Sequence, residues 1–164
     1  MASSQHTLFG GALAVIVAGA CIAGLVITGG PGQARKDKED AARLVAVSQM
    51  AYALACYQQA RGDIPENLVL VDAALGDAAT GIREPGRCLD AHTAADPVTG
   101  APFRLQRERN KVTHICATFA AKSEADEAVF SPVGTGVIPG LNDARPVAGE
   151  HCFALNLEAD LDTY

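Results

Sequence analysis

The chain lacks most of the features that mark a common class of enzyme or nucleic-acid-binding protein. It has no Trp, and aromatic residues make up only 5% of its 164 residues. A P-loop and the GxSxG, HExxH and GxGxxG motifs are all missing, which removes the usual sequence signals of nucleotide binding, acyl transfer and zinc proteolysis. A formal net charge of −6 excludes the broad basic face that a nucleic-acid partner requires. The sequence therefore predicts a protein that is not an enzyme and uses no cofactor.

Charge is also missing from one long stretch near the N-terminus. Residues 8–28 read LFGGALAVIVAGACIAGLVIT, 21 residues without Asp, Glu, Lys or Arg. A helix of this length spans about 30 Å, the thickness of the hydrocarbon core of a bilayer. We therefore divide the chain into an N-terminal tail (1–7), a transmembrane helix (8–28), a Gly/Pro linker (29–33) and one soluble domain (34–164). A cleaved signal peptide and, through Cys21, a lipoprotein are the alternatives.

Four of the five cysteines lie in the predicted soluble domain. Cys56, Cys88, Cys116 and Cys152 are even in number and widely spaced, which favours two structural disulfides in an exported protein. Three connectivities are open. We favour Cys116–Cys152, which joins two strand-like runs, and Cys56–Cys88, which joins a helix to a loop. On the chain-entropy estimate each would contribute about 3–4 kcal/mol.

A metal site is the alternative use of these cysteines. No CxxC pair is present, and His92, His114 and His151 lack the spacing of paired ligands. Zinc requires four ligands that converge on one point. We therefore predict no metal site.

Two features of the sequence disagree about the compartment of the domain. Arg35, Lys36, Lys38 and Arg43 follow the apolar stretch, and no Lys or Arg precedes it. Taken alone, this bias places the domain in the cytoplasm. The four cysteines indicate an oxidising compartment instead. We give the cysteines more weight and predict a single-pass protein of the bacterial inner membrane with a periplasmic domain.

The segment after the linker predicts a long amphipathic helix over residues 34–60. Its apolar residues share one stripe, which includes Leu44, Val47, Ala51 and Leu54. Acidic residues at its start, Asp40 among them, are interpreted as solvated. Gly62 suits the C-terminal end, and a shorter helix is expected within residues 66–77.

Three later runs predict β-strands, at residues 103–107, 111–119 and 151–157. Arg109-Asn110 is the expected tip of a hairpin, and the DPVTG sequence at 96–100 has the composition of a turn. The predicted fold is α+β, with the amphipathic helix packed on a small three-stranded antiparallel sheet.

This order of elements resembles the architecture of type IV pilins and pseudopilins. The YQQARGDIP segment at 57–65 is similar to the xYxxxxGxxP passage after the pilin helix, and DPVTGAPF at 96–103 is similar to the DPxGxPY turn of major pseudopilins. HICATF at 114–119 and Cys152-Phe153 resemble the end strands of uncharacterised single-pass bacterial membrane proteins. The resemblance covers residues 42–157. It implies a pilin-like fold and a location at the membrane.

Small residues recur on the predicted transmembrane helix. They are Gly10, Ala14 and Ala18, extended by Ala20 and Gly24. This spacing lets two helices approach closely in a membrane. We predict a non-enzymatic accessory or structural subunit of a multi-subunit bacterial membrane complex (respiratory, photosynthetic or secretory), with the bilayer and other subunits' transmembrane helices as partners. The alternatives are a pseudopilin-like component of a secretion or pilus system and a periplasmic thiol enzyme.

Overall fold

The computed structural model describes residues 11, 13–21, 23–24, 30–80, 82, 88–124 and 136–161. The chain divides into two compact units, Met1–Asp37 and Lys38–Tyr164. In the first unit, residues 11, 13–21 and 23–24 are helical and exposed. No helix formed by the described residues is long and apolar enough to cross a membrane.

The first long helix, α2, spans Gly30–Arg61. The prediction of a linker at 29–33 and a helix start at 34 is therefore wrong for residues 30–33. The reason is that Pro31 lies in the first turn, where its missing N–H would have no partner in the helix anyway. Gly30 has a φ of +68°, which glycine adopts without steric cost. At the other end, Gly62 donates its backbone N–H to the carbonyl of Gln58 and has a φ of +86°, as expected of a residue that ends a helix.

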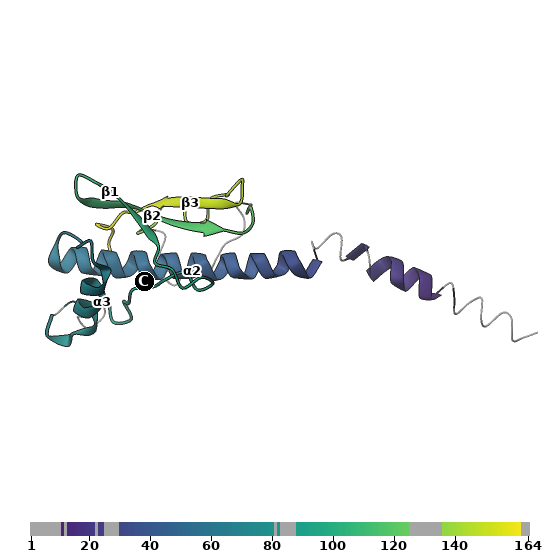
Figure 1. Cartoon of the computed structure of the whole chain (residues 1–164), viewed down its shortest axis with the longest axis horizontal. Coiled ribbons are helices and arrows are strands. Elements are labelled where there is room, and N and C mark those ends of the chain that lie inside the picture. The colour runs from purple at the N-terminus through teal and green to yellow at the C-terminus, as the bar shows by residue number, and fades with distance from the viewer. Residues whose placement is uncertain are drawn as a thin grey trace, which may run out of the picture. The chain divides into compact units, whose positions relative to one another are not determined.

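The central part of α2 is buried on more than the predicted stripe. Leu44, Val47, Ala51 and Leu54 are in the core as predicted, and they are joined there by Ala46, Met50 and Ala53. In Figure 1 the sheet lies along one side of α2 and α3 on the other. A helix covered from more than one side buries more than a single stripe.

A second, shorter helix follows, as predicted within residues 66–77. Helix α3 spans Leu68–Gly76, and the Asn67 side chain caps its start by accepting a hydrogen bond from the Val69 N–H. A single 3₁₀ turn, η1, follows at Ala78–Thr80. Val71 and Leu75 are the buried residues of α3.

The three predicted strands form one antiparallel sheet in the order β1-β2-β3. Strand β2 spans Lys111–Phe119 as predicted. Strand β1 spans Arg104–Glu108, one residue later than predicted. Strand β3 spans Gly149–Ala154 rather than 151–157. The Leu155 N–H still donates to the Thr113 carbonyl of β2, but the next N–H, that of Asn156, donates to the Val137 carbonyl outside the sheet.

The tip of the β1–β2 hairpin is Arg109-Asn110, as predicted. Both residues have positive φ, +47° and +71°. A two-residue loop with this geometry matches the right-handed twist of the strands. Further along the hairpin the register shifts between Gln106 and Arg107, a β-bulge that increases local twist.

The core lies between α2 and the sheet and continues under α3. Its fully buried side chains include Met50, Leu54, Leu75 and Ile115. Phe119 and Phe153 meet edge to face on neighbouring strands, with ring centroids 6.0 Å apart. One apolar cluster therefore unites the elements of the second unit.

Candidate functional site

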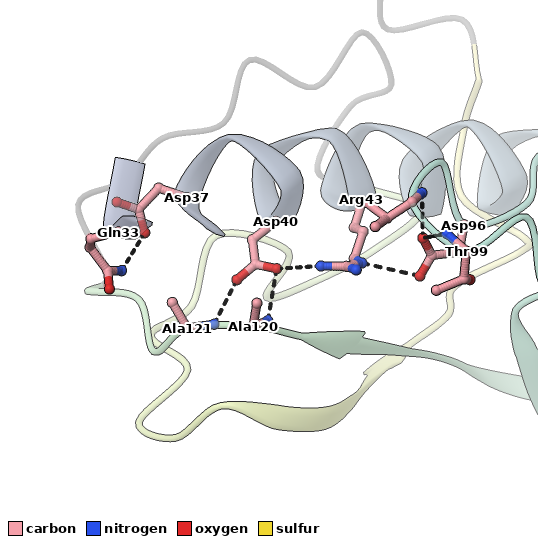
Figure 2. A network of polar contacts seen from close by, with 9 residues as sticks. Gln33, Asp37, Asp40, Arg43, Asp96, Thr99, Ala120 and Ala121 are labelled. Carbon is pink, nitrogen blue, oxygen red and sulfur yellow. Dashed lines mark hydrogen bonds and ion pairs between the residues drawn. The ribbon is translucent and has the colours of Figure 1, made fainter. Parts of the chain in front are cut away.

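A buried polar network lies near the start of the second unit (Figure 2). Its first member is Asp40 on α2, only 4% exposed. One carboxylate oxygen accepts the backbone N–H of Ala120 at 2.9 Å, and the other accepts that of Ala121 at 2.8 Å. The interpretation of Asp40 as a solvated residue is therefore wrong. Its hydrogen-bond donors come from the segment just after β2, 80 residues along the chain, which local sequence does not reveal.

Arg43 is the centre of this network. Its Nη1 donates to Asp40 Oδ1 at 2.7 Å, and its Nε donates to Asp96 Oδ2 at 3.1 Å. Arg43 is itself buried, with 7% of its surface exposed. Arg43 therefore forms its ion pairs inside the domain.

The predicted turn at 96–100 supplies the third charge. Asp96 Oδ1 accepts the N–H groups of Val98 and Thr99 at 2.8 and 3.1 Å, so the carboxylate folds back on its own turn. The other oxygen then points at Arg43. The Gly100 N–H donates to the Asp96 carbonyl at 2.8 Å, and Gly100 has a φ of +71°. The turn thus holds Asp96 in the orientation in which it accepts from Arg43.

The electrostatics of the network favour its charged state. Burial raises the pKa of Asp96, but the N–H groups of Val98 and Thr99, and then Arg43, lower it, and the net result lies below the ordinary value. Burial lowers the pKa of Arg43, whereas hydrogen bonds and charge from Asp96 and Asp40 raise it to a net value above the ordinary one. In its charged state the network joins α2 to the turn before β1 and to the segment just after β2.

A pocket of about 230 Å³ lies beside the network. Arg43 and Asp96 form part of its wall. Its other lining residues are Thr99, Ala101, Pro102, Phe103, Arg104, Cys116, Ala117, Thr118 and Glu150. Both arginines of the wall are already ion-paired, Arg43 with two aspartates and Arg104 with Glu150 at 2.6 Å. This pairing leaves no obvious positive charge to bind an anion.

The disulfide pairing is confirmed for all four cysteines. Cys56 is bonded to Cys88, with their Cα atoms 5.9 Å apart. Cys116 is bonded to Cys152, with their Cα atoms 4.0 Å apart, and the two are direct partners in the β2–β3 register. Cys21 is exposed and is a free cysteine. The disulfides join α2 to the segment after η1 and β2 to β3.

The predicted helix-packing residues belong to the first unit. Ala14, Ala18, Ala20 and Gly24 are exposed residues in helical conformation, and Gly10 lies outside the described residues. No described element of the chain covers Ala14, Ala18 or Ala20. Nothing in the chain itself therefore tests whether they contact another helix.

The three histidines considered as metal ligands each have a separate local environment. His92 Nδ1 is 2.7 Å from the Asp90 carbonyl, His114 Nδ1 is 3.0 Å from Thr113 Oγ1, and the His151 ring meets the Phe153 ring edge to face at 4.8 Å. Within the described residues, no group of three or more His, Cys, Asp or Glu side chains could hold a metal ion.

Comparison of the chain with protein-family models, curated proteins and solved structures gave no match. Arguments about its function therefore rest on its own residues. Of these, sequence analysis identified the cysteines and missed the Asp40–Arg43–Asp96 network. The i, i+3 spacing of Asp40 and Arg43 and the Asp-Pro turn were the available signals.

Proposed function

We propose that this chain is a non-enzymatic structural subunit of a multi-subunit bacterial membrane complex, anchored by one helix over residues 8–28. The observation that carries the proposal is a cluster of large apolar residues on the N-terminal helix that face outward. Leu13, Val15, Ile16 and Val17 are 55–72% exposed. Each such side chain gains about 1.5–3 kcal/mol when it leaves water. A bilayer, together with other transmembrane helices, supplies that environment.

The two disulfides support a periplasmic place for the domain. Structural disulfides persist in oxidising compartments and are rare in the cytosol. Arg35, Lys36, Lys38 and Arg43 still favour a cytoplasmic domain under the positive-inside rule, and in this proposal the two disulfides outweigh them.

The anchor is tested by alkaline carbonate washing of membranes from cells that express the full chain. We expect the unaltered protein to stay in the membrane pellet and the double variant Val15→Lys/Ile16→Lys to be released. Each Lys at the centre of a transmembrane helix costs about 2.5–3.5 kcal/mol. The matched control is Val69→Lys/Leu70→Lys, at two exposed apolar residues of α3, which should fractionate like the unaltered chain. Release of the unaltered chain, or equal behaviour of the two double variants, would rule out the anchor.

The role as a subunit is tested separately, by copurification after extraction in a mild detergent. We expect a membrane protein to copurify in fixed ratio and to be lost from Ala14→Leu and Ala18→Leu, because the larger side chain holds two helices apart. If nothing copurifies in fixed ratio, the subunit role fails while the anchor can still stand.

A second candidate is a pseudopilin-like component of a secretion or pilus system. A long helix that packs on a three-stranded antiparallel sheet supports it. The residues after Gly11 read ALAVI and lack the Glu that a pilin carries at position five of its mature helix. A mature N-terminus at residue 11 or 12, found by peptide mapping, would favour this candidate over the first.

A further inference from the structure

The two disulfides have different surroundings. Cys56 and Cys88 are 2% and 5% exposed, so both ends of that bond lie in the core. Cys116 is 2% exposed, but its partner Cys152 is only half-buried and lies on β3, at an edge of the sheet. Cys116 also lines the pocket beside the sheet. Cys152 is therefore the most exposed of the four bonded cysteines, and we expect a reagent in solution to reach its bond before it reaches Cys56–Cys88.

Polar N–H groups surround the same sulfur. Gln106 Nε2 is 3.4 Å from Cys152 Sγ, and Arg104 Nη2 is 3.8 Å from it. Arg104 and Gln106 are two residues apart on β1, so both side chains stand on one face of the sheet. Glu150 fixes the guanidinium of Arg104 through two hydrogen bonds, at 2.9 and 2.6 Å. Among the described residues, Arg104 and its partner Glu150 are the charged groups beside Cys152, and the titratable His114, which pairs with Gln106 and lies two residues from Cys116, stands on the same face of the sheet.

These groups suit a sulfur that becomes an anion. A thiolate is stabilised by nearby N–H donors and by a guanidinium, which lower the pKa of the thiol. Glu150 reduces the net charge of the pair but holds the Arg104 donor in position. At the other disulfide the hydrogen bonds involve the backbone of Cys88: its N–H donates to Tyr52 Oη at 3.1 Å and its carbonyl accepts the Ala91 N–H at 3.2 Å.

We propose that Cys116–Cys152 is a site of thiol–disulfide exchange with a dithiol protein or small dithiol, and that Cys56–Cys88 is a permanent structural bond. A thiolate of the dithiol attacks Cys152 Sγ, forms a mixed disulfide and releases Cys116 as a thiolate, which takes a proton from solvent. The second thiol of the reagent loses its proton to solvent, and its thiolate attacks the reagent's own sulfur in the mixed disulfide and releases Cys152 as a thiolate beside Arg104 and Gln106. Two electrons pass from the dithiol, which becomes a disulfide, to the Cys116–Cys152 pair. This inference does not rest on the proposed function.

The first test is reduction of the full native chain in detergent by dithiothreitol, followed by timed alkylation and peptide mass spectrometry. We expect Cys116 and Cys152 to become alkylated about tenfold faster or more than Cys56 and Cys88. Equal rates, or earlier opening of Cys56–Cys88, would overturn the proposal. Far-UV circular dichroism on the same samples verifies that the fold persists while the first bond opens.

The second test addresses Arg104 and Gln106 as positioning residues, through the pH dependence of Cys152 alkylation in the selectively reduced chain. We expect Arg104→Leu and Gln106→Leu to move the midpoint of alkylation to higher pH and to slow the rate at pH 7 several-fold. Arg61→Leu, at the exposed end of α2, is the matched control and should leave the midpoint unchanged. Unchanged midpoints in both β1 variants would overturn the assigned role of the N–H donors. Far-UV circular dichroism verifies the fold of each variant, and Arg104→Lys, which keeps the charge, takes the place of Arg104→Leu if that variant is misfolded.

Discussion

The two units of the chain use the same apolar residue types in opposite ways. On the N-terminal helix, Val15 and Ile16 are 72% and 67% exposed, whereas in the second unit Val47 and Ile115 are completely buried. The second unit also buries charge, since Asp40 and Arg43 are 4% and 7% exposed. The second unit thus forms its own apolar interior and pairs its buried charges. None of the described residues of the first unit is buried, so its apolar side chains depend on their surroundings.

The buried charges of the second unit are held by an almost complete set of partners. Each carboxylate of the network accepts two backbone N–H bonds and one from Arg43. Removal of one member leaves the others buried without a full set of partners, which costs more than the pair itself contributes.

The largest effect is expected from Arg43→Met, which tests that pairing. The variant leaves Asp40 and Asp96 buried without a cation, and we expect a loss of about 3–5 kcal/mol in the free energy of unfolding. The measurement is denaturant unfolding of the full chain in detergent, followed by circular dichroism. Arg61→Met, at an exposed position of the same helix, should cost less than about 1 kcal/mol. A loss as small for Arg43→Met would mean that the network contributes little to folding.

A direct comparison of the two units comes from shortening one apolar side chain in each. Leu54 is 0% exposed, and Leu54→Ala should lower the free energy of unfolding by about 2–5 kcal/mol, because it removes buried methyl groups and leaves a cavity. Val17 is 55% exposed, and Val17→Ala should change it by less than about 0.5 kcal/mol in the same assay. Comparable losses for both variants would show that the N-terminal helix packs within the folded protein, and the contrast between the units would be lost.

Local patterns in the sequence predicted much of the second unit. Strand β2 was predicted residue for residue because alternation and β-branched residues are properties of one short run. The pairing of Cys116 with Cys152 followed from two strands that lie side by side. A hairpin tip at Arg109-Asn110 needs only two residues in the left-handed region.

The parts that were missed depend on distant partners. The acidic run around Asp40 is interpreted as solvated from local sequence, whereas the N–H groups of Ala120 and Ala121, 80 and 81 residues away, join Arg43 in making Asp40 a buried hydrogen-bond acceptor. The end of β3 depends on Val137, because the Asn156 backbone N–H donates to the Val137 carbonyl and not to the sheet. The start of α2 at Gly30 shows a different limit, since a proline that would break the middle of a helix is well tolerated in its first turn.

The smallest expected effect concerns His151 on β3. This residue is half-buried, between the exposed side chains of the N-terminal helix and the buried core of the second unit. Burial and then the charge of Arg145 lower the pKa of His151, while Asp143 raises it, and the net value lies below the ordinary 6.5. As the pH falls, the unfolded chain therefore binds a proton at His151 before the folded chain does. The contribution of neutral His151 to the free energy of unfolding is present above pH 6.5 and is lost as the pH falls below that value. Because solvent screens a half-buried group, we expect a loss of less than about 1 kcal/mol in the free energy of unfolding. His151→Gln should remove this part of the pH dependence between about pH 7 and 5, and exposed His92→Gln should keep it. If the slope survives in His151→Gln or disappears in His92→Gln, the assignment to His151 is wrong, and the edge of the sheet is as solvated as the N-terminal helix.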